Sequence, residues 1–146
     1  MTNLKKWTAV AMVMIALFTS CKTNDAPQEY INTYTQTYTV YQKNWNIGID
    51  DNNDKYYYYE FQEPNLSRYI YENGSMQAFL YVSGENISPL PFNDYLIDKT
   101  NTDIKWTEQV TCEFRPGYVT FIVKSSDHLQ IPPYYDEYDF MVRFMW

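Results

Sequence analysis

The sequence of 146 residues has little glycine and little cysteine, with 4 glycines and 2 cysteines. So little glycine, together with only 7 prolines, excludes a collagen-like or low-complexity chain. Two cysteines cannot build a framework of several disulfides, so a folded domain here must be held together by its core. The chain also shows no internal repeat.

Basic residues are scarce as well. The chain has 11 Lys and Arg against 18 Asp and Glu. Nucleic acids and anionic lipid surfaces are bound by basic patches, so this balance argues against both as electrostatic partners. An acidic surface mainly keeps a domain soluble and apart from its neighbours.

The one apolar run, residues 7–18, is too short to cross a membrane, which takes about 20 residues. It follows Lys5 and Lys6 and precedes Thr19, Ser20 and Cys21. This order is typical of a secretory signal peptide. The small residues before the cysteine indicate a bacterial lipoprotein signal over residues 1–20, with Cys21 lipidated. A plainly cleaved secretory signal and a retained anchor are the alternatives.

A lipidated Cys21 predicts a protein held at the cell envelope, because several acyl chains together anchor stably in a bilayer. Lys22 stands where Asp would favour the inner membrane, so the outer membrane is expected. Residues 21–32 are polar and unpatterned, which predicts a flexible tether. Without residues 1–20 the chain has 126 residues (146 less 20), and 9 basic side chains (11 less two) face 18 acidic ones. A length of 126 residues is enough for one domain.

Aromatic residues are abundant, with 16 Tyr, 8 Phe and 4 Trp, and such residues favour strands. Residues 33–40 alternate between threonine and mostly apolar side chains, as a half-buried strand does. Similar patterns recur along the chain. We therefore predict an all-β, mainly antiparallel fold over residues 33–146: a single two-layer β-sandwich of about seven or eight strands with one short helix. A small barrel is the alternative. The further strands are expected at residues 55–61, 76–83, 92–98, 104–115, 118–125 and 139–146.

The helix is expected within residues 63–74. Pro64 suits a first helical position, and Leu66, Tyr69 and Ile70 have helical spacing. Gly74 would supply a left-handed cap. The alternative is a hairpin, because Asn-Gly is also a strong turn signal.

Two other segments carry specific expectations. Residues 84–91 are expected to form a loop. The strand at 104–115 is expected to turn one apolar face inward. That face comprises Ile104, Trp106, Val110, Cys112 and Phe114.

Aromatic and turn segments occur at residues 56–61, 69–74, 90–92, 106–108 and 116–121, followed by an aliphatic–aromatic C-terminal strand. This set resembles a group of small Bacteroidota lipoproteins of unknown function, over roughly residues 40–146. Some of those relatives carry a collagen-like linker after the lipid cysteine, and this chain has none. The resemblance implies an envelope location and a single domain, and it assigns no catalytic residue.

No catalytic constellation emerges from the sequence. His128, the one histidine, has Ser125, Ser126 and Asp127 beside it, but no nucleophile elbow accompanies them. Cys112 lies in an apolar strand pattern, where a free cysteine behaves as a small hydrophobe. Two carboxylates at a set separation can hydrolyse a glycosidic bond, but 18 acidic residues give many such pairs by chance. We therefore expect no enzyme and no cofactor.

Residues 50–54 form the one weak metal candidate, a calcium site at Asp50, Asn52 and Asp54. The EF-hand pattern would need glycine at position 55 and glutamate at position 61, where this chain has Lys55 and Phe61. A plain polar turn is the main expectation.

Tyrosines on both faces of the strand at 55–61 and in the proline-rich loop that follows residue 127 suggest a surface for recognition. The residues singled out are Tyr56, Tyr58, Tyr134 and Tyr135. Exposed aromatic rings are enriched at protein interfaces, so a protein-contact or structural role in the envelope is expected. A carbohydrate-binding module, in which flat rings stack on sugars, is the alternative. Simple packing at the edge of the core also accounts for such tyrosines.

Overall fold

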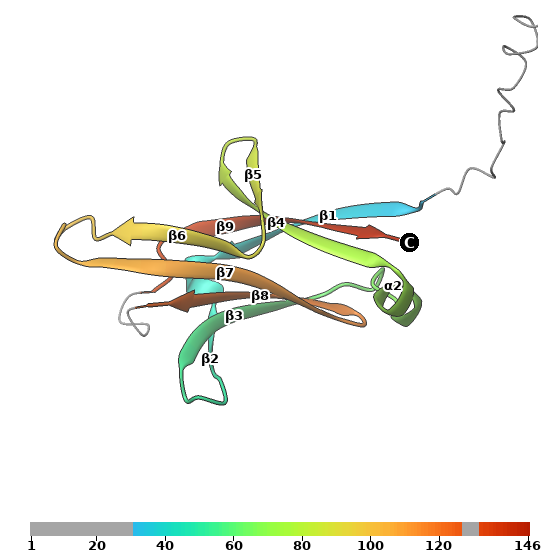
Figure 1. The fold of residues 1–146 in the computed structure, drawn as a ribbon, viewed down its shortest axis with the longest axis horizontal. Helices are drawn as coiled ribbons and strands as arrows, with labels where there is room; N and C mark the ends of the chain where they lie inside the picture. The colour runs from blue at the N-terminus through green and yellow to red at the C-terminus, as the bar shows by residue number, and fades with distance from the viewer. Residues whose placement is uncertain (1–30, 127–131) are drawn as a thin grey trace, which may run out of the picture. The chain divides into compact units, whose positions relative to one another are not determined.

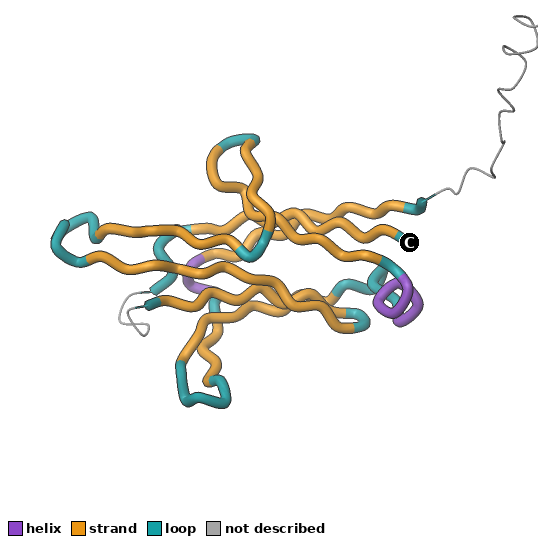
Figure 2. The backbone as a smooth tube through the Cα atoms, viewed as in Figure 1, coloured by secondary structure: helices purple, strands orange, loops and turns teal. Residues whose placement is uncertain are grey.

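The computed structural model describes residues 31–126 and 132–146. The predicted signal at 1–20, Cys21, most of the tether and His128 lie outside the described residues. The described part contains nine strands, one 3-10 helix and one α-helix (Figures 1 and 2). The elements are β1 Thr33–Tyr41, η1 Gln42–Asn44, β2 Asn46–Ile49, β3 Lys55–Gln62, α2 Arg68–Asn73, β4 Ser75–Ser83, β5 Asn86–Pro89, β6 Phe92–Ile97, β7 Lys105–Arg115, β8 Tyr118–Ser125 and β9 Glu137–Met145.

These strands form two sheets, which confirms the predicted all-β sandwich. One sheet has four strands in the order β1-β9-β4-β5, and the other has five in the order β2-β3-β8-β7-β6. Every strand pairing is antiparallel. Figure 1 shows the β2–β3 and β4–β5 hairpins projecting away from the two layers in opposite directions.

The core lies between the inner faces of the two sheets. The rings of Phe121 on β8 and Phe140 on β9 stack across it, with centroids 3.8 Å apart and planes 9° from parallel. Alternate residues of both strands are fully buried. Burial of such large side chains supplies the main driving force for folding.

The alternation predicted for residues 33–40 is confirmed in β1. Tyr38 and Val40 are buried, and all four threonines of the strand are exposed. β1 pairs along its whole length with β9, in which the alternate residues Tyr138, Phe140 and Val142 are also buried. Directly paired residues lie on the same face, so the two strands bury one common surface.

The predicted helix over 63–74 is too long, since only Arg68–Asn73 is helical. The Ser67 side chain caps it by accepting a hydrogen bond from the Ile70 N–H. Residues 63–67 instead form a turn tied to the β7–β8 turn, with hydrogen bonds from the Glu63 N–H to the Gly117 carbonyl and from the Gly117 N–H to the Leu66 carbonyl. Pro64 therefore precedes the helix.

Gly74 does not take the predicted left-handed conformation, because its φ is −97°. Position 74 requires glycine for another reason, which is the lack of space for a side chain. A Cβ atom at this position would lie 2.6 Å from the Ile70 carbonyl oxygen and 2.7 Å from that of Met145. Glycine lets the end of α2 approach the end of β9 closely.

Two further expectations need correction. Residues 84–91 are not a loop throughout, because they include the edge strand β5. Pro89 is the last residue of this strand, where the missing N–H costs little.

Ile104 lies outside β7 and is exposed, so it does not belong to the inner face. The position on that face which the apolar pattern left out is Glu108.

Candidate functional site

Tyr56 and Tyr58 project from the outer face of β3, and both are half-buried. Their ring centroids lie 5.9 Å apart with planes tilted by 51°. They border a shallow hollow of about 270 Å³ together with Glu60 and Arg115, which form a two-pronged ion pair at 2.8 and 3.2 Å. Two tilted rings do not make the flat platform expected for sugar stacking.

Tyr134 and Tyr135 stand perpendicular to each other, with ring centroids 5.1 Å apart and planes at 86°. Tyr134 also meets the Trp106 ring edge-on at 5.8 Å. The Tyr135 hydroxyl donates a 2.5 Å hydrogen bond to Oδ2 of Asp94 on β6. The rings of the two tyrosines therefore pack against each other at a right angle, and Tyr135 borders a cavity.

That cavity, the acidic pocket, has a volume of about 460 Å³. It opens where β4 leaves β9: their pairing ends at Leu80 and Phe140, although β4 continues to Ser83. β6 of the other sheet forms the opposite wall. The residues that line it include Leu80, Phe92, Asp94, Tyr135, Glu137 and Asp139.

Glu108 on β7 is the direct cross-strand partner of Asp94 on β6, and it is 1% exposed. Its carboxylate accepts hydrogen bonds from the Tyr138 hydroxyl at 2.7 Å, the Tyr134 N–H at 3.0 Å and the Trp106 Nε1–H at 3.4 Å. Burial, and then the charge of Glu108, raise the pKa of Tyr138 well above its usual value. This buried network supports the wall of the acidic pocket.

Sequence reasoning missed Glu108, although a signal was present. Trp106, Glu108 and Val110 alternate along β7, so the period of two places the carboxylate on the buried face. A buried carboxylate must be hydrogen-bonded, and three donors meet this requirement here.

A second buried carboxylate, Glu63, is 3% exposed. It accepts a 2.5 Å hydrogen bond from the Tyr38 hydroxyl and a 3.0 Å bond from the Asn65 N–H. Burial and this bond raise the pKa of the Tyr38 hydroxyl. Glu63 fixes the turn before α2 against β1, so its role is structural.

The calcium candidate residues lie in the turn between β2 and β3. Oδ1 of Asp50 accepts hydrogen bonds from the N–H groups of Asn52 and Asp54, and Oδ2 pairs with Lys124 Nζ at 3.0 Å. Both oxygens of Asp50 thus have protein partners. Over residues 31–126 and 132–146, no group of three His, Cys, Asp or Glu side chains could hold a metal ion.

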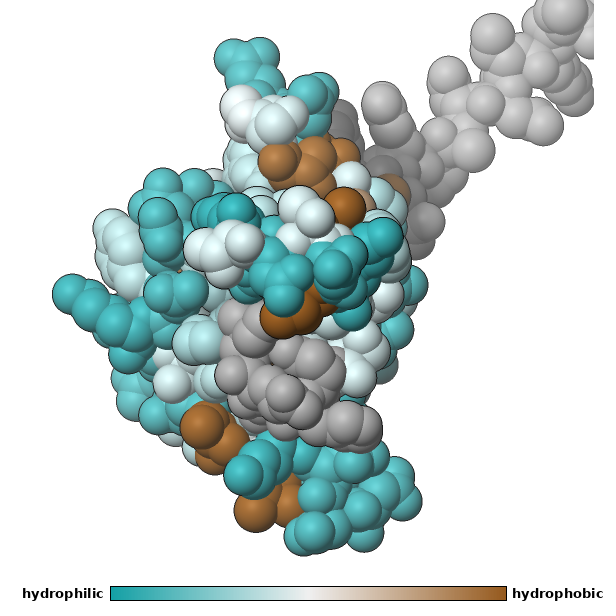
Figure 3. All heavy atoms as spheres, turned by 90° about the vertical axis from the view of Figure 1, so that its left-hand side faces the viewer, coloured by the Kyte–Doolittle hydropathy of each residue, from teal (hydrophilic) through white to brown (hydrophobic). Residues whose placement is uncertain are grey.

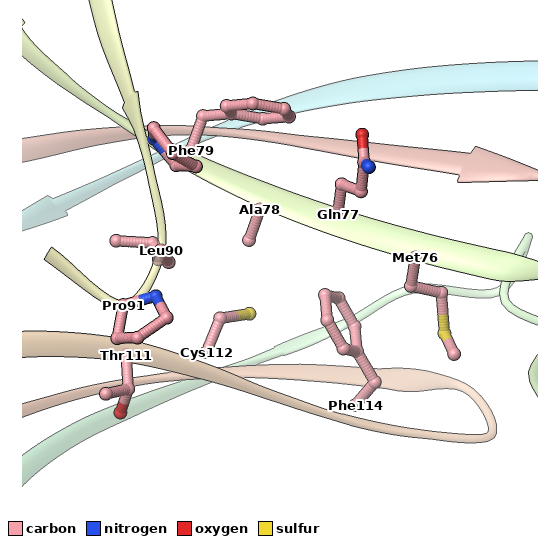
Figure 4. Close-up of a pocket in the computed structure, with 10 residues that line it drawn as sticks. Met76, Gln77, Ala78, Phe79, Leu90, Pro91, Thr111, Cys112 and Phe114 are labelled. Atoms are coloured by element: carbon pink, nitrogen blue, oxygen red, sulfur yellow. The ribbon is translucent and has the colours of Figure 1, made fainter.

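A second cavity of about 390 Å³ lies between β4 and β7 (Figure 4). Its lining is mainly apolar and includes Met76, Leu90, Cys112 and Phe114. Burial raises the pKa of the Cys112 thiol, which keeps the sulfur protonated and unreactive at neutral pH. Its polar lining residues, Gln77 on β4 and Thr111 on β7, point their side chains away from the groove (Figure 4).

No family model, curated protein or solved structure matches this chain. Within the described residues, no helix has the length and apolar character needed to span a bilayer. The site is therefore interpreted from its own geometry.

Proposed function

We propose that this protein is a non-catalytic interaction module of the bacterial cell envelope, anchored through lipid on Cys21 and facing another envelope protein. The order of residues 1–21 and the resemblance to small Bacteroidota lipoproteins support the anchor and the outer-membrane location. The polar segment 21–32 would connect the lipid to the sandwich.

The observation that carries the protein-contact role is the exposed edge strand β6. β6 is the last strand of its sheet, so one side of its backbone has no strand partner among the described residues. Its outer face exposes Tyr95 at 64% and Ile97 at 42%. An edge strand with exposed apolar side chains is a template for a strand of another chain.

The face of the molecule shown in Figure 3 favours a narrow contact of this kind. On the face shown in Figure 3, hydrophobic colour is confined to small separate areas within a mainly hydrophilic surface. A contact built on backbone hydrogen bonds at a strand edge needs only a few apolar side chains.

The buried groups support a role without catalysis. Glu63 and Glu108 are committed to tyrosine hydroxyls and backbone N–H groups, and Cys112 is held as a thiol. A catalytic acid, base or nucleophile would need access to a substrate. The alternative function, a carbohydrate-binding module, has less support, because neither tyrosine pair is coplanar.

Site-directed photo-crosslinking in living cells tests the proposal. A benzophenone amino acid replaces Tyr95, and in a matched control it replaces Tyr69 on α2, whose exposure is 65%. We expect a crosslink to an envelope protein from position 95 and none from position 69. Equal crosslinking from both positions, or none from 95, would contradict the proposal. Selective retention on a glycan array would support the alternative.

A further inference from the structure

We propose that the groove of about 390 Å³ between β4 and β7, the β4–β7 groove, accepts an extended strand of a partner protein that pairs with the open edge of β7. The strand that fits has apolar side chains at the two positions facing the groove and a basic side chain at the position between them. This surface differs from the outer side of β6 that carries the proposed function. The inference therefore goes beyond that function and is tested separately.

The end of β7 has an open edge. On one side β8 pairs with β7 as far as Arg115, but on the other side β6 pairs with it only as far as Val110. The chain leaves this edge at Pro91, which links β6 to β5 of the other sheet. Residues 111–115 therefore have no strand partner on that side among the described residues. A strand bound there would continue the line of β6.

The backbone groups at this edge point into the gap. Thr107 directs its N–H and its carbonyl toward β8, since both bond to Ser126. Successive residues of a strand direct these groups to opposite sides, and the β7–β8 register is unbroken over the rest of β7. The N–H and carbonyl groups of Cys112 and Phe114 therefore point to the open side. Such an edge is a template for another strand, whereas an acyl chain offers it no hydrogen bond.

The facing edge of β4 is open along the same groove. β5 pairs with β4 only from Phe79 onward, and the Leu90 N–H donates to the Ala78 carbonyl at 2.9 Å. Residues 75–77 of β4 therefore have no strand partner on this side within the described chain. The β4–β7 groove thus lies between two open edges, one from each sheet, where an added strand would close the sandwich.

The lining of the groove suits apolar side chains. Met76 and Ala78 on β4 face Cys112 and Phe114 on β7 across the gap, with Leu90 beside them (Figure 4). Met76, Cys112 and Phe114 are only half-buried, although they lie on the inner faces of the two sheets. Apolar side chains of a bound strand would remove this surface from water, and the small Ala78 and Cys112 leave room for them.

Charge sets the remaining chemistry of the strand. No charged residue of the described chain lines the groove, so a charged side chain placed there would be desolvated without a partner. On the outer face, exposed Glu113 lies between the groove-facing Cys112 and Phe114. Its neighbour Arg115 is engaged by Glu60, and no ion pair among the described residues includes Glu113. A basic side chain paired with Glu113 across the edge would meet the opposite charge.

Hydrogen–deuterium exchange with mass spectrometry, on the full chain in lipid nanodiscs, tests the inference. The probe is the peptide acetyl-Thr-Val-Lys-Val-Thr-amide, whose valines would pair with Cys112 and Phe114 and whose lysine would pair with Glu113. We expect saturable binding that slows exchange of the amides within residues 111–115 about tenfold or more. N-methylation of both valines should weaken binding about tenfold or more, because the donors to β7 are lost. The control peptide acetyl-Thr-Lys-Val-Val-Thr-amide has the same composition without alternation and should not bind.

Position 112 offers a matched pair of variants. Cys112→Leu puts a larger side chain into the groove and should abolish binding of the peptide, whereas Cys112→Ala should retain it. A thermal melt shows whether each variant is folded. Glu113→Gln, at an exposed position, keeps the test decisive where the leucine variant does not fold, and it should weaken binding about threefold.

Each result bears on the proposal. Absence of binding, equal binding of the methylated and unmethylated peptides, or protection only outside residues 111–115 would overturn it. Binding of palmitate in place of the peptide would assign the groove to lipid, and protection that rises with protein concentration alone would assign it to a second copy; both would also overturn it. A crosslink at position 95 without peptide binding would refute this inference alone. Peptide binding without that crosslink would contradict the contact proposed at β6 and support this one.

Discussion

The hydroxyl of Tyr138 on β9 donates a 2.7 Å hydrogen bond to Oε2 of Glu108 on β7, and so joins the two sheets through a buried polar pair. The Tyr38–Glu63 pair repeats this arrangement between β1 and the turn before α2. A buried carboxylate that loses a donor keeps its full desolvation cost.

Removal of the Tyr138 hydroxyl should therefore destabilise the fold. We expect Tyr138→Phe to lower the free energy of unfolding by about 1–3 kcal/mol, because Glu108 loses one of its donors. Denaturant titration followed by circular dichroism measures this. Tyr69→Phe on exposed α2 is the control and should change stability by less than about 0.5 kcal/mol. Equal stability of both variants and the parent would show that the pair is not coupled to folding.

Alkaline pH should unfold the domain in step with ionisation of the buried tyrosines. Burial is the first cause that raises the pKa values of Tyr38 and Tyr138 above the model-compound value of 10.0. A raised pKa means that the folded state keeps the proton while the unfolded state releases it. The protonated hydroxyls of the buried tyrosines thus contribute fully to the stability of the fold below pH 10.0, and this contribution is lost as the pH rises above that value.

Tyrosinate absorbance and near-ultraviolet circular dichroism, recorded in one titration, check this prediction. One fraction of the tyrosines should ionise only as the tertiary signal disappears, and Tyr138→Phe should reduce that fraction. Complete ionisation of all tyrosines with the tertiary signal intact would be incompatible with the buried network.

Gly74→Ala should be destabilising although its backbone conformation is open to any residue. The added Cβ would lie 2.6 Å from the Ile70 carbonyl oxygen and 2.7 Å from that of Met145. Overpacking of this kind costs about 1–3 kcal/mol, which a thermal melt detects. Gly84 has open space around it but a φ of +53°, so Gly84→Asn should be tolerated better than Gly74→Ala. The reverse order would contradict the close approach of α2 and β9.

Asp50 should contribute to stability near neutral pH and lose this contribution in acid. Its hydrogen bonds, first that from Lys124, lower its pKa below the model-compound value of 3.8. A lowered pKa gives a contribution that is present above the unfolded-state value and is lost as pH falls through the folded-state value. The stability difference between the parent and Asp50→Asn should thus shrink below about pH 4. A difference that stays constant down to acid pH would contradict the Lys124 contact.

Period-two patterns predicted most of the fold. In β1 and β9 the buried apolar side chains stand at alternate positions, so alternation identifies both strands and their buried faces. The helix was overestimated because Leu66 has helical spacing to Tyr69 and Ile70, yet its backbone is held by Gly117 in a turn. Contacts between distant segments decide such boundaries, and local spacing does not contain them.

The candidate site was predicted only in part. Tyr135 was expected at a recognition surface, and it does border the acidic pocket, but its partner Asp94 lies 41 positions away in the chain. Tyr56 and Tyr58 lie on the outer face of the five-stranded sheet, away from that cavity. The pocket lies where the pairing of β4 with β9 ends at Leu80, and the pairing of strands so far apart in the chain cannot be read from local sequence patterns.

The central claim, that lipid holds this domain at the cell envelope, is tested most directly by the intact mass of the protein purified from the cells that produce it. We expect a chain that begins at Cys21 and carries the additional mass of several acyl groups, and we expect those groups to be absent from Cys21→Ala. A chain that begins at an unmodified Met1, or at residue 21 without acyl groups, would contradict the account.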